Sequence, residues 1–186
     1  FYWRHNLHLV NCFLSEDNVT NIIQSSGMHK DLGVLSVDVD GIDYFLLEKC
    51  VVFRPAIIIT EYNSVFGNKK PITVPYREDF SRYKNKASSV LYGASLKAFE
   101  HLLIEHNYSL VGVNVGGNNA FFIRNDLFDK TNLKKVSSDT VFRKRIFSET
   151  KANEDVIGDE IYTEDMLRFK VFDVQTKQNT RLGDCL

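Results

Sequence analysis

Acidic side chains crowd one short stretch of the sequence. Asp38, Asp40 and Asp43 lie within residues 37–43, directly after the apolar run 33–37, which predicts a β-strand. Open α/β sheets bind their ligands at the carboxyl ends of strands. Carboxylates this close raise one another's pKa unless a cation or a ligand amine lies among them. The three side chains are therefore predicted to bind a divalent metal such as Mg²⁺ or an ammonium group.

The same stretch also has a purely structural interpretation. Asp40-Gly41 suits a tight turn, and Asp43 can cap the helix that is expected to follow. Alternation along a strand places Asp38 and Asp40 on one side of the chain, with Asp43 in the first helical turn. From the sequence alone, both interpretations stay open.

A second polar group follows the next apolar run. Residues 56–62 begin with a continuous apolar stretch, which predicts a strand buried on both faces of a parallel sheet. Glu61 and Asn63 share a face at its end, within reach of Asp38 and Asp40 on a parallel neighbour. Glu61, Asp38 and Asp40 are the predicted catalytic carboxylates, and Glu61 is a candidate general base. An ion pair of Glu61 with Arg77 or Arg82 is the alternative.

A long polar loop is expected over residues 63–88, which include Gly67, Pro71 and Pro75. Loops of this length in compact domains are usually lids or binding loops. Aromatic and arginine side chains suit sugars and planar groups. The predicted substrate-binding residues, which could equally pack the loop down, are Asn63, Tyr76, Arg77 and Tyr92.

Hydrophobic periodicity places these residues on a doubly wound α/β fold with a mostly parallel sheet. Parallel strands are expected over residues 7–13, 33–38 and 56–62. Helices are expected over 17–26, over a short segment from 44 to 50, and from Ser88 or Ser89 to His106. The Gly/Asn-rich link 114–119 predicts an antiparallel hairpin of 108–113 with 120–124 at the sheet edge.

The composition is that of a globular protein, with 44% hydrophobic and 25% charged residues among 186. The formal net charge of −1 gives no support to nucleic-acid binding, and no nucleic acid is expected. No apolar run approaches the ~18 residues of a membrane span. Cys12, Cys50 and Cys185 lie far apart and are odd in number, which favours a reducing, cytoplasmic location. The oligomeric state does not follow from the sequence.

The character of the chain changes after residue 127. Residues 129–151 carry seven basic against three acidic side chains, and residues 152–186 carry four basic against eight acidic ones. Such runs are usually solvated surfaces. Residues 1–127 are therefore predicted to form the α/β domain, with 128–186 as a charged extension that packs on it; a functional basic patch is the alternative.

Four motifs carry a resemblance to a known family. They are Leu-Ser-Val-Asp-Val-Asp-Gly-Ile-Asp-Tyr at 35–44, the stretch 55–63 with Ile-Ile-Ile-Thr-Glu-Tyr-Asn, Tyr-Gly-Ala-Ser-Leu at 92–96, and Asn-Ala-Phe-Phe-Ile-Arg at 119–124. Over roughly residues 7–127 the chain resembles the FkbM-type S-adenosylmethionine-dependent methyltransferases. The resemblance implies a class I, Rossmann-like methyltransferase fold with strands 3 to 7 present, and O-methylation of a small-molecule or glycan hydroxyl.

The same resemblance implies where the cofactor, S-adenosylmethionine, would lie. The end of strand 3 would meet the adenine and Asp38 the methionine moiety, so the implied cofactor-binding residues are Phe13, Ser15, Glu16 and Asp38. The family's glycine loop and ribose-binding acid belong to strands 1 and 2, which either precede Phe1 or are missing from a reduced fold. The 186-residue chain is thus expected to bind the cofactor weakly or not at all. A non-catalytic interaction module on a degenerate methyltransferase fold is the alternative.

Overall fold

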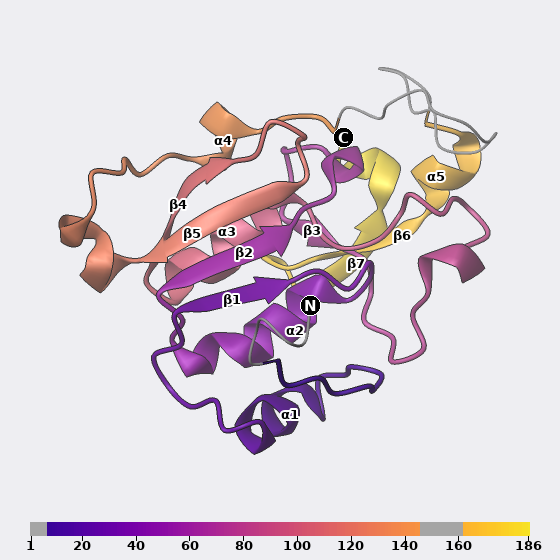
Figure 1. The fold of residues 1–186 in the computed structure, drawn as a ribbon. Helices are drawn as coiled ribbons and strands as arrows, with labels where there is room; N and C mark the ends of the chain where they lie inside the picture. Colours follow the sequence, from indigo (N-terminus) through magenta and orange to yellow (C-terminus); the bar gives the residue numbers. More distant parts are fainter. Residues whose placement is uncertain (1–6, 146–161) are drawn as a thin grey trace.

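The computed structural model describes residues 7–145 and 162–186, which form a mixed α/β fold around a four-stranded sheet (Figure 1). The sheet order is β1-β2-β5-β4. β1 and β2 are parallel, with Val37 opposite Thr60, whereas β5 is antiparallel to both β2 and β4. The strands are β1 (Val34–Val37), β2 (Ile57–Glu61), β4 (Tyr108–Val113) and β5 (Asn119–Arg124).

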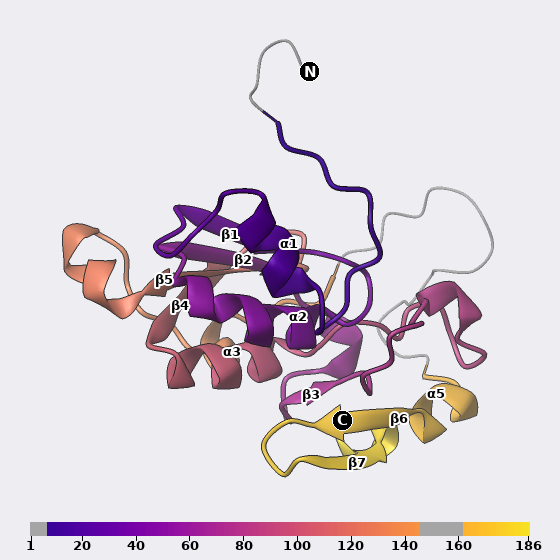
Figure 2. The same ribbon diagram turned by 90° about the horizontal axis from the view of Figure 1, so that it is seen from below.

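Helices α2 (Asp43–Cys50) and α3 (Leu96–Glu105) lie on one side of this sheet, and α1 (Val19–Ser25) packs against α2 beside the β1 edge (Figure 2). α2 connects β1 to β2, and such a crossover is what allows the two strands to run parallel. The Ser95 hydroxyl caps α3 by accepting the Ala98 N–H at 3.1 Å. The main core lies between these helices and the sheet and includes Ile58, Phe99 and Phe122, all fully buried.

A second, smaller sheet joins distant parts of the chain. Its order is β3-β6-β7, all antiparallel, from β3 (Ile72–Thr73), β6 (Lys170–Asp173) and β7 (Gln178–Arg181). A second buried cluster lies against it and combines Phe66 and Leu91 with Val171 and Leu182. The remaining elements are α4 (Ser138–Val141), α5 (Glu164–Arg168) and the 3-10 turns Val51–Phe53, Ser64–Phe66, Arg82–Lys84, Asn125–Lys130 and Leu182–Asp184.

Several sequence predictions are confirmed. A helix lies within residues 17–26 and a second one follows the acidic stretch. The strands near 33–38 and 56–62 are parallel, and residues 108–113 with 119–124 form an antiparallel hairpin. This hairpin forms one edge of the sheet, with β4 outermost. None of the helices in the described part of the chain has the length and the hydropathy needed to span a bilayer.

The predicted strand at residues 7–13 is wrong. These residues are in none of the strands, and Leu9 and Phe13 are 65% and 69% exposed. An extended segment becomes a strand only when a neighbour pairs with its backbone, and periodicity cannot supply that neighbour. The described sheet therefore holds one parallel pair and two antiparallel ones, so a mostly parallel, doubly wound sheet is not what the described residues form.

Two further expectations need correction. The helix expected from Ser88 or Ser89 begins at Leu96, because Gly93, at φ +66°, is held outside the helical conformation: its N–H donates to the Gly41 carbonyl, and its own carbonyl accepts the Val74 N–H. β2 is not buried on both faces. Ile58 is fully buried on the helix side, whereas Ile57 and its partner Val34 are 36% and 57% exposed on the other.

Candidate functional site

Three carboxylates meet at the carboxyl ends of β1 and β2. Oxygen atoms of Asp38, Asp40 and Glu61 all lie within 4.8 Å of one another. The register of the parallel pair, with Val37 opposite Thr60, places the residues that follow on the same edge of the sheet. Asp38 and Asp40 are exposed, and Glu61 is 8% exposed. The side chains that the sequence predicted as catalytic are thus brought together; they are called the carboxylate cluster below.

Asp43, the third predicted metal ligand, points elsewhere. Its carboxylate accepts hydrogen bonds from the Val39 N–H at 2.7 Å and the Gly41 N–H at 2.8 Å, and the residue is 1% exposed. Burial raises the pKa of Asp43, and the two backbone donors act in the opposite direction. Asp40 adopts φ +54° in the turn that these bonds close. Asp43 therefore holds the turn that presents Asp38 and Asp40. The expected turn at Asp40-Gly41 is confirmed, but the expected helix cap is wrong, because α2 has Ile42 at its N-cap and no side chain caps it.

Two arginines from different segments pair with the cluster. Arg82 donates to Asp40 at 2.9 Å, and Arg145 lies 3.5 Å from the Glu61 carboxylate, which also accepts a hydrogen bond from Asn118 at 3.3 Å. The ion pair considered for Glu61 was with Arg77 or Arg82. Glu61 instead meets Arg145, a residue outside every predicted site, whose only sequence signal is the basic run at 143–145.

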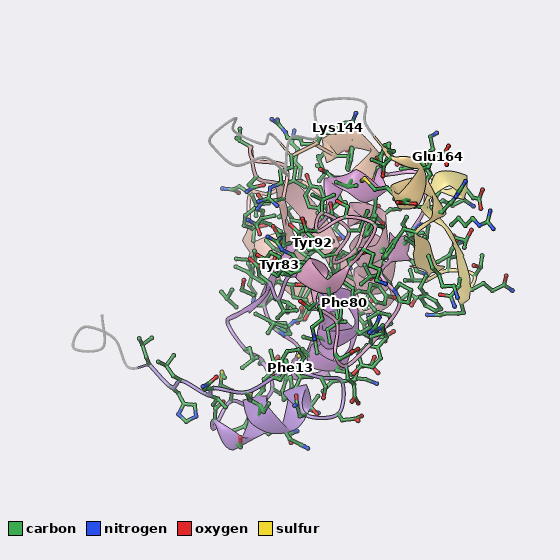
Figure 3. The ribbon with its side chains drawn as sticks, turned by 90° about the vertical axis from the view of Figure 1, so that its right-hand side faces the viewer. Phe13, Phe80, Tyr83, Tyr92, Lys144 and Glu164 are labelled. Atoms are coloured by element: carbon green, nitrogen blue, oxygen red, sulfur yellow. The ribbon has the colours of Figure 1, made fainter. Side chains whose placement is uncertain are left out.

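Tyr92 connects the two arginines. Its hydroxyl accepts a hydrogen bond from Arg145 at 2.8 Å, and the Arg82 guanidinium lies 4.7 Å from the centre of its ring. Arg82 also lies 5.0 Å from the ring of Tyr83, and Figure 3 shows the two tyrosines close together. Burial raises the pKa of Tyr92, and the Glu61 charge adds to this. Tyr92 thus lies at the cluster, where the sequence predicted a substrate-binding residue.

Glu61 is an acid whose pKa is raised to about 7. Burial is the main cause, and the nearby Asp38 charge acts in the same direction. The hydrogen bond from Asn118 and the charge of Arg145 lower it but do not offset burial. A carboxyl group that titrates near neutral pH can accept a proton and release it again.

The segment that carries Arg145 is anchored to the strand ends. The Tyr62 hydroxyl donates to the Arg143 carbonyl at 2.8 Å, and the Arg145 N–H donates to the Ser64 hydroxyl at 2.9 Å. Gly117, at φ +71°, lies so close that a Cβ there would be 2.5 Å from the Lys144 carbonyl oxygen. Residues 143–145 therefore lie directly over the β4–β5 turn and next to Glu61.

The other predicted substrate-binding residues have structural partners. The Asn63 side chain accepts the Val65 N–H and donates to the carbonyls of Val90 and Tyr92 at 2.7 and 2.8 Å, so it anchors the loop. The Tyr76 ring packs on Phe45, with ring centres 5.2 Å apart. Arg77 forms an exposed pair with Asp79 at 3.0 Å.

The residues implied to bind the cofactor precede α1 rather than end a strand. Phe13 is mostly exposed, and the Ser15 N–H donates to the Asn18 side chain at 2.9 Å. The Glu16 N–H donates to the Tyr76 hydroxyl at 3.2 Å, and partial burial raises the Glu16 pKa, an effect that Lys49 opposes. Apart from Asp38, the implied cofactor residues are therefore not part of the carboxylate cluster.

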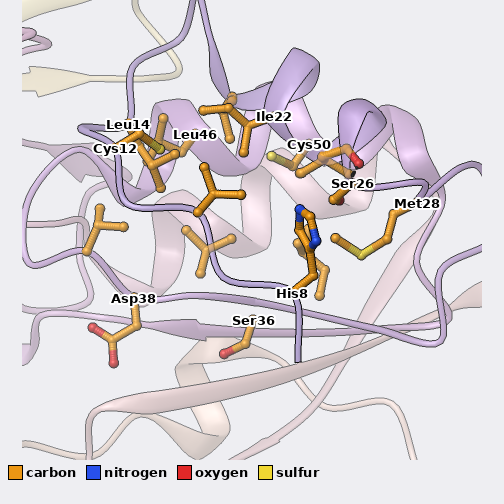
Figure 4. Close-up of a pocket in the computed structure, with 16 residues that line it drawn as sticks. His8, Cys12, Leu14, Ile22, Ser26, Met28, Ser36, Asp38, Leu46 and Cys50 are labelled. Atoms are coloured by element: carbon orange, nitrogen blue, oxygen red, sulfur yellow. Dashed lines mark hydrogen bonds between the residues drawn. The ribbon is translucent and has the colours of Figure 1, made fainter. Parts of the chain in front are cut away.

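An apolar cavity of about 400 Å³ lies beside the implied cofactor-binding residues, between residues 8–14, α1, α2 and β1 (Figure 4). Its lining alternates along the first segment, with His8, Val10, Cys12 and Leu14 facing inward, and Asp38 lies at one end. The sequence missed this cavity, because it is formed by a segment that was expected to be paired in the sheet.

Comparison of the chain with known protein families, with curated proteins and with solved structures finds no match.

Proposed function

We propose that the chain acts in S-adenosylmethionine-dependent O-methylation, with Asp38, Asp40 and Glu61 activating the hydroxyl of the acceptor. The observation that carries the proposal is the convergence of these carboxylates at the carboxyl ends of a parallel strand pair. That edge is where open α/β sheets bind ligands. The antiparallel hairpin of β4 and β5 next to this pair is compatible with the C-terminal part of a class I methyltransferase fold.

Methyl transfer to a hydroxyl requires a base, because a hydroxyl is a weak nucleophile until it loses its proton. Glu61, with a pKa of about 7, can take that proton at neutral pH. Arg145 and Asn118 hold the Glu61 carboxylate from the side. When bound, S-adenosylmethionine supplies an electrophilic methyl group on a positively charged sulfur. Activity is therefore expected to rise with pH as Glu61 loses its own proton.

The apolar cavity supplies a partial fit to the cofactor. Adenine needs flat apolar surroundings, which Leu14, Ile23 and Leu35 provide, and the ammonium group of the methionine moiety needs an anion, which Asp38 offers at one end. Cys12 and Leu14 line this cavity, and they would take over the adenine contact implied for Phe13 and Ser15.

A divalent cation such as Mg²⁺ is a second way for the same carboxylates to act. Asp38, Asp40 and Glu61 offer oxygen ligands only, the type that Mg²⁺ prefers. A bound cation lowers the pKa of a hydroxyl that coordinates to it. A chelator abolishes methyl transfer under this scheme and leaves it unchanged when Glu61 acts alone as the base.

The test is methyl transfer from isotopically labelled S-adenosylmethionine at millimolar concentration to a panel of small hydroxyl compounds and sugars. Glu61→Gln and Asp38→Asn are expected to lower the rate at least about a hundredfold, the low end of the usual contribution of a general base. Glu164→Gln is the matched control, because Glu164 is exposed and, among the residues that the structure describes, pairs with Arg168 alone. Equal rates for Glu61→Gln and Glu164→Gln at pH 7 would remove Glu61 from the reaction.

One observation favours a second function, that of a non-catalytic binding module. Asp40 and Glu61 already pair with Arg82 and Arg145, so much of the charge of the cluster is satisfied by the protein itself. Saturable ligand binding by the chain, without methyl transfer to any compound of the panel, would support the module instead of the enzyme.

A further inference from the structure

A second cavity, of about 460 Å³, is lined by the loop that carries Arg82. It is formed by residues 75–86 and by the start of β6, where Phe169 and Lys170 lie. None of the residues that the sequence predicted to be catalytic, cofactor-binding or metal-binding lines it. It is called the basic pocket below.

The charge of the basic pocket differs from that of the whole chain. Four basic side chains line it, with Asp79 as the acidic one, whereas the chain has a formal net charge of −1. Asp79 is already held by Arg77 through two hydrogen bonds, of 3.1 and 3.0 Å. Besides Arg77, the basic side chains that line the pocket are Lys84, Lys86 and Lys170. Within residues 7–145 and 162–186 these three side chains have neither a hydrogen-bond nor an ion-pair partner, so three positive charges at the pocket are not paired with an anion of the described residues.

The pocket also offers apolar contact. The rings of Phe80 and Phe169 line it, and each is half-buried. Aromatic rings combined with a few polar groups are typical of small-molecule sites, in which the rings contact the ligand body and the charges orient it. The chemistry that fits is a compact ligand with one anionic group and an apolar face, such as a sugar ring that carries a phosphate ester or a carboxylate.

The loop that lines the basic pocket also contacts the carboxylate cluster and its turn, through Arg82 and Phe80. The ring of Phe80 lies on the turn after β1, so close that a Cβ on Gly41 would be 2.7 Å from it. Arg82, in the same loop, donates to Asp40 at 2.9 Å. A ligand that orders this loop thus acts on a segment that also contacts the turn at Asp40.

We propose that the basic pocket binds the anionic group of a sugar-sized ligand through Lys84, Lys86 and Lys170. That this ligand is the methyl acceptor rests on the proposed function; the binding itself does not.

The experiment measures binding to the full chain without cofactor, by calorimetry and by NMR chemical-shift mapping. The probes are glucose 6-phosphate, glucuronate and neutral glucose. At least one charged sugar is expected to bind saturably, with a dissociation constant near about 1 mM, and glucose at least about tenfold more weakly. Binding of glucose 6-phosphate alone assigns the pocket to phosphate esters, binding of glucuronate alone assigns it to carboxylates, and binding of both supports the shared chemistry.

Two double variants locate the binding. Lys84→Gln with Lys170→Gln is expected to weaken the charged sugar about tenfold or more, since both replaced groups face the pocket. Lys130→Gln with Lys134→Gln removes two exposed charges in another part of the chain and is expected to leave the dissociation constant unchanged. The proposal is overturned by equal affinity for glucose, by equal losses in the two double variants, or by the absence of binding at about 20 mM. Charged-sugar binding without methyl transfer would keep the pocket and refute the proposed function.

Discussion

Asp43 and Glu61 are two buried carboxylates that follow neighbouring parallel strands, and they differ in their hydrogen-bond donors. Asp43 accepts two backbone N–H groups at 2.7 and 2.8 Å, whereas Glu61 meets the side chains of Asn118 at 3.3 Å and Arg145 at 3.5 Å. Burial raises the pKa of both. Backbone donors are fixed by the fold, and side-chain donors can turn toward a ligand. Burial alone therefore does not distinguish Asp43 from Glu61, whereas the kind of hydrogen-bond donor does.

The largest expected effect is a loss of stability when Asp43, the carboxylate held by backbone donors, is replaced. Asp43→Asn puts an amide NH₂ against either the Val39 or the Gly41 N–H, so one buried donor loses its acceptor. We expect the free energy of unfolding to fall by about 3 kcal/mol, measured by urea titration. Asp38→Asn is the matched control: Asp38 is exposed, and a change below about 0.5 kcal/mol is expected. Similar losses in both variants would contradict a structural role specific to Asp43.

The second prediction concerns the pH dependence of stability at Glu61. Its pKa is about 7 in the folded protein against an ordinary value of 4.5, so the folded state binds the proton more tightly. The stability that this group contributes is present below pH 4.5 and is lost as the pH rises through 7. Glu61→Gln removes this loss, so from about pH 4 to about pH 8.5 the variant should gain about 3 kcal/mol relative to the wild type.

The control for this pH series is Glu164→Gln, which removes an exposed carboxylate that pairs with Arg168. Its stability difference from the wild type is expected to stay nearly constant over the same range. If the stability difference between Glu61→Gln and the wild type is also constant over this pH range, Glu61 titrates like an exposed carboxyl group.

The third prediction tests whether the donors of Glu61 depend on the segment 143–145. Gly117→Ala strains a residue at φ +71° and places a methyl group 2.5 Å from the Lys144 carbonyl oxygen. We expect a loss of about 2 kcal/mol, together with changed NMR shifts at Arg145. Gly33→Ala is the control, because a Cβ there would meet nothing within 4 Å. Unchanged Arg145 signals in Gly117→Ala would show that the segment is held without this contact.

The sequence predicted the cluster better than it predicted the fold around it. Asp38, Asp40 and Glu61 could be foreseen, because strand ends are set by local periodicity and the crossover helix forces parallel pairing. Residues 7–13 were mispredicted because a strand is defined by its neighbour. Asp43 had two open interpretations, and only its short bonds to Val39 and Gly41 decide between them.

Arg145 illustrates what local reasoning leaves out. It lies 84 positions from Glu61 in the sequence, within a basic run of the kind that is usually a solvated surface. Three tertiary contacts, at Tyr62, Ser64 and Gly117, bring it to the strand ends. No periodicity encodes such contacts, so Arg145 could not be assigned to a site from the sequence. The loop 63–88 with Arg77 was predicted to bind a ligand, but its contact with Phe169 and Lys170 was not.

The smallest expected effect is a change in the pKa of Glu61 when Arg145 is replaced, with no change in the pKa of Asp43. The positive charge of Arg145 lowers the pKa of Glu61, whereas burial and Asp38 raise it. Arg145→Met should therefore move the Glu61 pKa further up from about 7, and Arg145→Lys should restore part of the difference, as followed by the carboxyl ¹³C shift. Asp43, whose pKa is governed by burial and by its own backbone donors, should not respond to either variant. A parallel shift of both carboxyl groups would point to a general change of the fold, and an unchanged Glu61 would mean that the 3.5 Å contact with Arg145 does not set its ionisation.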